Sequence, residues 1–130
     1  PLEQLRAVIA DRGPLGMDAY MSLCLHDPDW GYYATRPALG AEGDFITAPL
    51  VSQMFGELLG LWAVEVWTRL GAPARVLLVE VGPGDGTLMQ DMLRAARVVP
   101  AFVEAAEVWF VEPSAPLRER QRSRFGYGPF

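Results

Sequence analysis

The chain has 130 residues, of which 51% are hydrophobic and 21% are charged, and its formal net charge at pH 7 is -5. This composition supports a packed core and excludes a disordered chain. The acidic balance argues against a nucleic-acid-binding module, because such a module needs a basic surface to displace counterions from phosphates. All 11 basic residues are arginines, and we interpret the four at positions 118–124 as the solvated face of a helix.

The cysteine content and the hydropathy of the chain indicate the cellular compartment in which the protein is located. The chain has one cysteine, Cys24, so it cannot form an intrachain disulfide or a multi-cysteine zinc site, and we expect no metal. This usage fits a reducing compartment, which predicts a cytoplasmic location in a bacterium or the mitochondrial matrix in a eukaryote. No apolar run reaches the roughly 20 residues of a membrane span, and no signal-peptide pattern opens the chain, so we expect a soluble protein.

The N-terminal part of the chain predicts two short helices and a long loop. Apolar residues at helical spacing over residues 2–9 and 17–25 indicate the helices, and Gly13 with the proline after it ends the first one. Residues 26–48 are rich in proline, glycine and aspartate and have no sustained period. We expect an ordered loop there, because its aromatic residues argue against disorder.

A third helix is predicted from Pro49 to Gly71. Pro49 can occupy the first helical position, and the glycine followed by a proline ends the helix. The helix is apolar on most sides, so we expect it to be buried against a sheet.

The second half of the chain has the order of a βαβ unit. A continuous β-branched and apolar run at residues 76–79 is typical of a strand covered on both faces, and a second strand is expected at residues 108–111. A glycine-rich break and a helix at residues 88–96 lie between them, and an arginine-rich helix follows. We therefore predict an α/β fold in which a helical and loop region, residues 1–71, precedes the first part of a Rossmann-like domain, residues 72–130.

The segment EVGPGDGT at residues 80–87 carries the chemistry, because its glycines fall at every second position between a strand and a helix. A P-loop would need a lysine beside the last glycine, and the chain has no lysine. A dinucleotide-binding loop would place its third glycine one residue later, and Asp85 adds negative charge where the pyrophosphate would lie. The spacing favours an S-adenosylmethionine enzyme. A glycine-rich turn that only joins strand to helix remains the alternative.

The two predicted strands both end in glutamate, which suits this cofactor. Glu80 complements the amino group and sulfonium of S-adenosylmethionine, and free N–H groups of the loop complement its carboxylate. Glu112 is placed to accept hydrogen bonds from the ribose hydroxyls. The predicted cofactor-binding residues of these segments are Glu80, Gly82, Pro83, Gly84, Gly86, Thr87, Glu112, Pro113 and Ser114.

Nearly the whole chain resembles the MidA-like family of methyltransferases. The distinctive block is GDFITAP with VSQMFGE within residues 43–57, supported by HDP and GYY within residues 26–33, VEVGPG at residues 79–84 and VEPS at residues 111–114. The family includes a mitochondrial complex I assembly factor that methylates arginine. The resemblance implies a Rossmann-like class I methyltransferase that uses S-adenosylmethionine, and a protein partner that presents the arginine.

The resemblance also implies that residues 44–53 cap the cofactor pocket. It adds three cofactor-binding candidates, Thr47, Ser52 and Gln53. Ser52 and Gln53 also lie in the first turns of their helix, where polar side chains satisfy free backbone groups, so a capping role stays open for both. Leu50 stands where the family usually has glutamate, and Asp85 stands where it often has arginine.

The family is more than twice as long as this chain, so we expect an incomplete Rossmann-like unit. Its open sheet edge predicts exposed apolar surface and self-association into a homo-oligomer. No catalytic residue is assigned, and we expect those that deprotonate the arginine to lie outside the segment, so the isolated segment should be inactive as an enzyme. We interpret the single histidine, His26, as a helix-end cap or packing residue rather than a general base. The rival function is a non-catalytic module that binds a partner through the helix at residues 51–70 and the aromatic loop.

Overall fold

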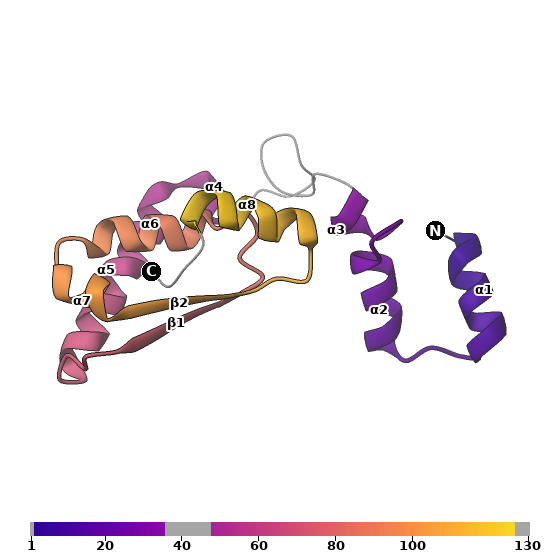
Figure 1. Cartoon of the computed structure of the whole chain (residues 1–130), viewed down its shortest axis with the longest axis horizontal. Helices are drawn as coiled ribbons and strands as arrows, with labels where there is room; N and C mark the ends of the chain where they lie inside the picture. Colours follow the sequence, from indigo (N-terminus) through magenta and orange to yellow (C-terminus); the bar gives the residue numbers. More distant parts are fainter. Residues whose placement is uncertain (1, 36–47, 127–130) are drawn as a thin grey trace.

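The computed structural model describes residues 2–35 and 48–126, and it is an α/β structure. The elements in chain order are α1 (Leu2–Arg12), α2 (Met17–His26), α3 (Tyr32–Thr35), α4 (Ala48–Val51), α5 (Gln53–Arg69), β1 (Val76–Val81), α6 (Thr87–Ala96), α7 (Pro100–Ala105), β2 (Ala106–Val111) and α8 (Ala115–Phe125). Helices α1 and α2 lie to one side of a body made of the sheet and the later helices (Figure 1).

The two N-terminal helices confirm the sequence prediction, and the loop after them is only partly as predicted. Gly13 ends α1 with a φ of 81°, and its N–H donates to the Ile9 carbonyl at 2.9 Å. Helix α3 forms one turn inside the predicted loop, where the Thr35 hydroxyl donates to the Gly31 carbonyl at 2.8 Å. A four-residue helix is too short to produce a periodic pattern. The rest of the predicted loop, residues 36–47, lies outside the described residues.

The predicted third helix is two helices, so the expectation of one continuous helix is wrong. Ser52 is extended, with φ -149° and ψ 121°, and separates α4 from α5. Its carbonyl accepts from the Phe55 N–H at 3.1 Å, which starts the new helix. The apolar pattern runs through this residue, so periodicity could not reveal the break. The predicted end is confirmed by Gly71, which has a φ of 86°.

Helix α5 packs mainly against α6 through two glycines rather than broadly against the sheet. A Cβ atom at Gly60 would lie 2.3 Å from the Met92 carbonyl oxygen, and one at Gly56 would lie 2.6 Å from Asp91 Cβ. The two helix backbones are therefore too close for side chains at these positions. Large side chains on other faces of α5 are exposed, including Trp62 at 63%. The predicted burial of this helix is thus met only on its α6 side and at its C-terminal end.

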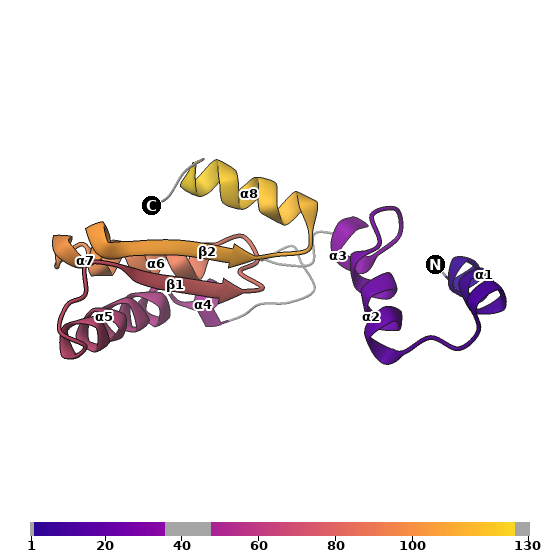
Figure 2. The ribbon, with the colours of Figure 1, turned by 60° about the horizontal axis from the view of Figure 1, so that its bottom comes forward.

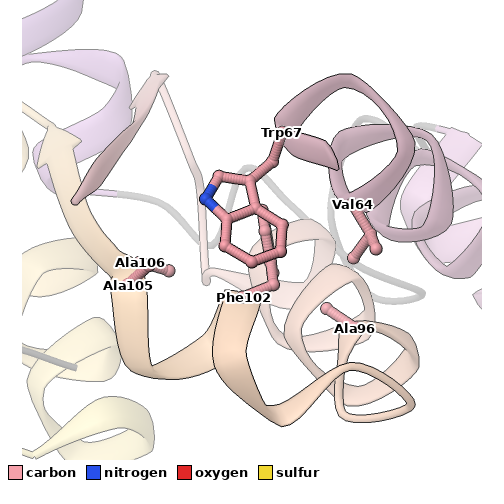
Figure 3. Close-up of a cluster of buried hydrophobic side chains, with 6 residues drawn as sticks. All are labelled: Val64, Trp67, Ala96, Phe102, Ala105 and Ala106. Atoms are coloured by element: carbon pink, nitrogen blue, oxygen red, sulfur yellow. The ribbon is translucent and has the colours of Figure 1, made fainter. Parts of the chain in front are cut away.

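The core lies where the C-terminal end of α5 meets α7 and the start of β2. Its buried members are Val64, Trp67, Ala96, Phe102, Ala105 and Ala106 (Figure 3). The rings of Trp67 and Phe102 meet edge to face with centroids 5.6 Å apart. The Trp67 indole N–H donates to the Pro73 carbonyl at 2.9 Å, which satisfies its polar atom. Helix α7 was not predicted, because its apolar residues run directly into the strand.

The two strands pair in parallel, which confirms the predicted βαβ unit. The register runs from Val76 opposite Ala106 to Val81 opposite Val111. Helices α5, α6 and α8 lie over one face of the sheet, whereas the opposite face has no helix over it among the described residues (Figures 1 and 2). Parallel sheets are normally covered on both faces. The carboxyl ends of both strands reach the same edge, where the glycine loop begins.

Candidate functional site

The candidate site lies at the carboxyl ends of β1 and β2, the usual place for ligands in parallel α/β sheets. Gly82 continues directly from β1, and its N–H donates to the Val111 carbonyl at 2.9 Å, so the start of the loop is fixed to the end of β2. Glu80 lies near the end of β1, and Glu112 directly follows β2. The fold therefore brings both predicted acidic residues to one edge of the sheet.

The glycine loop has a backbone that other residues could not adopt easily. The φ angles of Gly82, Gly84 and Gly86 are 69°, 58° and 83°. These values lie in the left-handed region, which side chains with a Cβ atom rarely enter. A Cβ atom at Gly86 would also lie 2.6 Å from a ring carbon of Phe125. The alternating glycines are therefore required by the turn as well as by any close approach of a ligand.

Two hollows flank this loop and share Val81, Gly82 and Gly84. The first, which we call the Glu80 hollow, measures about 350 Å³ and is lined by Pro49, Leu50, Glu80, Val81, Gly82, Pro83, Gly84, Asp85, Thr87 and Leu88. The second, the Glu112 hollow, measures about 330 Å³ and is lined by His26, Tyr33, Val81, Gly82, Gly84, Val111, Glu112, Pro113 and Leu117. Each hollow thus holds one of the two strand-end acids beside the same backbone.

Glu80 is held in an environment that opposes its charge. Burial raises the pKa of Glu80 to about 7, and the negative charge of Asp85 adds to the rise. Its Oε2 atom is buried and finds no hydrogen-bond partner within residues 2–35 and 48–126. A buried unpartnered carboxylate oxygen is costly. This acid therefore lacks the structural partner that would explain its place.

Glu112 organises the end of β2. Its Oε1 atom accepts the Ser114 N–H at 2.8 Å, which orients the carboxylate. The Ser114 hydroxyl donates to the Tyr33 carbonyl at 3.2 Å instead of capping α8. Ser114 is buried, so this contact joins the N-terminal segment to the site from 81 residues away in the chain.

Helix α8 holds the glycine loop through contacts that the sequence did not reveal. The buried Gln121 amide donates to the Gly84 carbonyl at 2.6 Å. Arg124 donates to the Thr87 hydroxyl at 2.7 Å and to Asp85 Oδ2 at 3.2 Å. The Asp85 charge thus has a cationic partner. Local sequence patterns could not have predicted these contacts, because they join residues 37 and 39 positions apart in the chain.

The arginine cluster is more than a solvated face. Arg120 is exposed, as that interpretation requires. Arg118, in contrast, donates to the Glu112 carbonyl at 2.9 Å and to the Pro113 carbonyl at 2.6 Å. Together with Arg124, it joins α8 to the two loops at the carboxyl ends of the strands. The predicted solvated face therefore fits the exposed Arg120, Arg122 and Arg124, although Arg124 also pairs with Asp85, and Arg118 is the partly buried member of the cluster.

The candidate cofactor-binding residues of the predicted cap do not lie at the two hollows, unlike most of those in the loops that follow β1 and β2. Ser52 occupies the residue before α5, yet its side chain makes no capping hydrogen bond within the described residues. The Gln53 amide is exposed and donates to Glu57 Oε1 at 2.7 Å. Neither residue lines the two hollows, whereas Leu50 lines the Glu80 hollow. Thr47 lies outside the described residues.

Neither a metal-binding cluster nor a membrane-spanning helix occurs in the described part of the chain. No group of three His, Cys, Asp or Glu residues there could hold a metal ion. No helix there is both long and apolar enough to cross a membrane.

The chain matches a family model described as "putative S-adenosyl-L-methionine-dependent methyltransferase" over residues 58–127. Among curated proteins, it is 46% identical to the mitochondrial protein arginine methyltransferase NDUFAF7 homolog of Drosophila melanogaster over 96% of its length. It is 43% identical to the mitochondrial protein arginine methyltransferase NDUFAF7 of Bos taurus over 92% of its length. The chain spans 28% of the length of each of these two relatives.

A solved structure has the same fold over most of this chain. It is a Burkholderia thailandensis protein, described as a "likely methyl transferase", bound to S-adenosyl-homocysteine. The match has a TM-score of 0.76 and 32% sequence identity, and covers 95% of this chain and 32% of that one.

Proposed function

We propose that this chain forms the cofactor-binding part of an enzyme that methylates arginine in a protein. The premise is that the chain belongs to the family of S-adenosyl-L-methionine-dependent methyltransferases. The single observation that carries this proposal is the convergence of Glu80 and Glu112 on two hollows that share one glycine loop. A turn that only joined a strand to a helix would have no reason to keep beside it a buried carboxylate oxygen that has no partner within the described residues.

The residues of the site fit the cofactor. Glu80 lines its hollow, and an ammonium group entering there would pair with the charge of its carboxylate, whose buried Oε2 lacks a partner in the described structure. The carboxylate of Glu112 is oriented by the Ser114 N–H and can accept hydrogen bonds from a ribose diol. The glycines leave the loop backbone open to close approach. We therefore assign the amino-acid end of the ligand to the Glu80 hollow and its nucleoside end to the Glu112 hollow.

Most of the remaining predicted residues of the two loops line the hollows, whereas Gly86 lines neither. Pro83, Gly84 and Thr87 line the Glu80 hollow, and Pro113 lines the Glu112 hollow. Ser114 acts by orienting Glu112. We propose that Thr47, Ser52 and Gln53 contribute to a cap over the bound cofactor, as the family resemblance implies.

When bound, S-adenosylmethionine supplies a methyl group activated by its sulfonium, and the transfer is an in-line displacement. The contribution of this chain is to hold the donor in one orientation, because alignment provides much of the acceleration in such reactions. The arginine acceptor must also lose a proton despite its very high pKa, which calls for acidic groups at the guanidinium. We assign no residue of this chain to that step.

The names of the relatives suggest the acceptor and the compartment. Both are mitochondrial protein arginine methyltransferases by name. We propose a protein substrate that presents arginine, linked to respiratory complex I assembly, and a mitochondrial matrix location in a eukaryote or a cytoplasmic one in a bacterium. We further propose that residues 1–71 supply the cap and residues 72–130 the cofactor-binding domain.

Calorimetric titration with S-adenosylhomocysteine tests the function. The chain should bind the ligand, and Glu112→Gln should weaken binding by about 1.5–3 kcal/mol, the contribution of hydrogen bonds to a charged group. Gln retains an acceptor for the Ser114 N–H, so the loop should keep its shape. Glu104→Gln, at an exposed position on α7, is the matched control and should bind normally. A chain that binds no ligand would contradict the proposed function and favour the non-catalytic module.

A further inference from the structure

The turn after α2 holds His26 in a defined place. Asp27 Oδ1 accepts the N–H groups of Asp29 at 3.0 Å and Trp30 at 3.3 Å, which closes the turn. A Cβ atom at Gly31 would lie 2.4 Å from the Asp27 nitrogen, so the backbone folds back tightly on itself. The His26 ring stacks on Tyr33, with centroids 5.6 Å apart and an interplanar angle of 20°.

This turn is also attached to the candidate site. The Tyr33 carbonyl accepts the hydrogen bond from the buried Ser114 hydroxyl, and Ser114 in turn orients Glu112. His26 and Tyr33 both line the Glu112 hollow. The N-terminal segment therefore supplies one wall of a hollow whose other walls come from the glycine loop and the start of α8.

His26 has a polar atom that packing alone does not explain. Its Nδ1 atom is buried and has no hydrogen-bond partner in the described parts of the chain. A phenylalanine would stack on Tyr33 equally well without the cost of an unpartnered nitrogen. His26 lines the Glu112 hollow, and a half-turn of the imidazole about χ2 exchanges ring nitrogens with ring carbons while it preserves the stack, so a ligand in the hollow can hydrogen-bond the ring.

The chemistry of the Glu112 hollow indicates which part of the cofactor binds there. Its lining combines the apolar Val81, Val111 and Leu117 with Glu112 and the imidazole. Its volume of about 330 Å³ is within the range of small-molecule sites. We infer that His26 is a ligand-binding residue that hydrogen-bonds the nucleoside portion of the cofactor, with Tyr33 holding its ring. This inference rests on the proposed function, and it assigns the turn between α2 and α3 to the cofactor site.

The single histidine makes the inference directly testable by NMR. A tag-free chain labelled with 15N-histidine gives imidazole signals that are assigned by their loss in His26→Phe. S-adenosylhomocysteine and 5′-methylthioadenosine, which share the nucleoside, should both shift the His26 signals, whereas homocysteine should not. Calorimetry should show that His26→Phe, which keeps the stack on Tyr33, binds 5′-methylthioadenosine roughly two- to tenfold more weakly. His26→Gln, which keeps a donor and an acceptor, should recover part of this loss.

The outcomes separate the two proposals. If S-adenosylhomocysteine binds while the His26 signals stay in place, the assignment of His26 is overturned and the proposed function stands. The same conclusion follows if homocysteine shifts the signals and 5′-methylthioadenosine does not. If the chain binds neither S-adenosylhomocysteine nor 5′-methylthioadenosine, both proposals are overturned.

Discussion

At the scale of single residues, Glu80 is a binding-site residue whose ionised form destabilises the folded state. The apolar Leu50 lines its hollow, and burial is the main cause of the raised pKa of Glu80. The Asp85 charge adds to the rise, although Arg124 pairs with that carboxylate. The folded state therefore binds the Glu80 proton more tightly than the unfolded state does.

The first prediction concerns stability and pH. Because the pKa of Glu80 rises from 4.5 to about 7 on folding, its contribution to stability is fully present below pH 4.5 and is lost as pH rises through 7. The difference in free energy of unfolding between Glu80→Gln and the parent chain should therefore shift in favour of the variant by about 1–2 kcal/mol from pH 4.5 to pH 8. This figure allows for the half-exposed site. Urea unfolding at the two pH values measures this gain, with Glu104→Gln as the control. A stability difference between Glu80→Gln and the parent chain that is the same at both pH values would contradict the assignment.

The second prediction concerns ligand binding by the same residue. An ammonium group in the Glu80 hollow favours the ionised carboxylate, so ligand affinity should rise with pH as Glu80 ionises around its pKa of about 7. S-adenosylhomocysteine should bind the parent chain more tightly at pH 8 than at pH 5.5, by about tenfold. Glu80→Gln should bind weakly at both pH values. Equal pH dependence in the two chains would show that the amino group lies elsewhere.

At the scale of elements, α8 determines the shape of the glycine loop from outside it. Gln121 is 4% exposed, and its amide gives the Gly84 carbonyl a partner where the loop turns away from water. Phe125 packs against Phe110 with ring centroids 5.1 Å apart, which keeps the helix on the sheet. The loop conformation thus depends on packing between segments far apart in sequence.

The third prediction follows from this attachment. Gln121→Leu should destabilise the chain by about 1–3 kcal/mol, because it leaves the Gly84 carbonyl without its partner. Hydrogen–deuterium exchange at residues 82–86 should accelerate more than exchange in α6. Ser123→Ala, at an exposed position on the same helix, should change neither quantity. Unchanged exchange in the loop of the Leu variant would mean that the loop holds its shape alone.

The fourth prediction concerns the contact between α5 and α6. Gly60→Ala raises helix propensity by about 1 kcal/mol, yet its Cβ atom would lie 2.3 Å from the Met92 carbonyl oxygen. The backbones must separate, so we expect a net loss of about 1–3 kcal/mol in thermal or urea unfolding. Leu58→Ala, at a residue 59% exposed on the same helix, should cost much less. A more stable Gly60→Ala variant would contradict the close packing of these helices.

Local patterns predicted most elements, whereas tertiary packing determined the exceptions. The β-branched run and the helical spacing correctly predicted both strands and most of the helices, and Gly13 and Gly71 correctly marked the ends of α1 and α5. The extended Ser52 and the short α7 escaped prediction, because the apolar pattern continues through both. Motif spacing placed Glu80 and Glu112 in the hollows, but it could not identify Gln121 or His26 as neighbours of the loop.

At the scale of the whole molecule, one face of the sheet has no covering layer among residues 2–35 and 48–126. Alternate residues of each strand point to that face, where Leu77, Val79 and Val81 of β1 adjoin Trp109 and Val111 of β2. All five are more than half exposed. No helix lies over them in the described structure, as Figure 2 shows. Contiguous apolar surface of this kind is typical of interfaces rather than of solvated faces.

The last prediction is that this face drives self-association of the chain. Val79 and Trp109 lie opposite each other in the register and are 53% and 56% exposed, so lysines at both positions would place two charges at the centre of the apolar surface. Sedimentation velocity should show concentration-dependent association of the parent chain and a shift toward monomer in Val79→Lys/Trp109→Lys. The matched control is Leu70→Lys/Val98→Lys, which makes the same change in net charge at two positions that are each 71% exposed and lie outside both strands. It should associate like the parent chain. Equal loss of association in both double variants would attribute the effect to net charge, and a parent chain that stays monomeric throughout would contradict the role of the uncovered face.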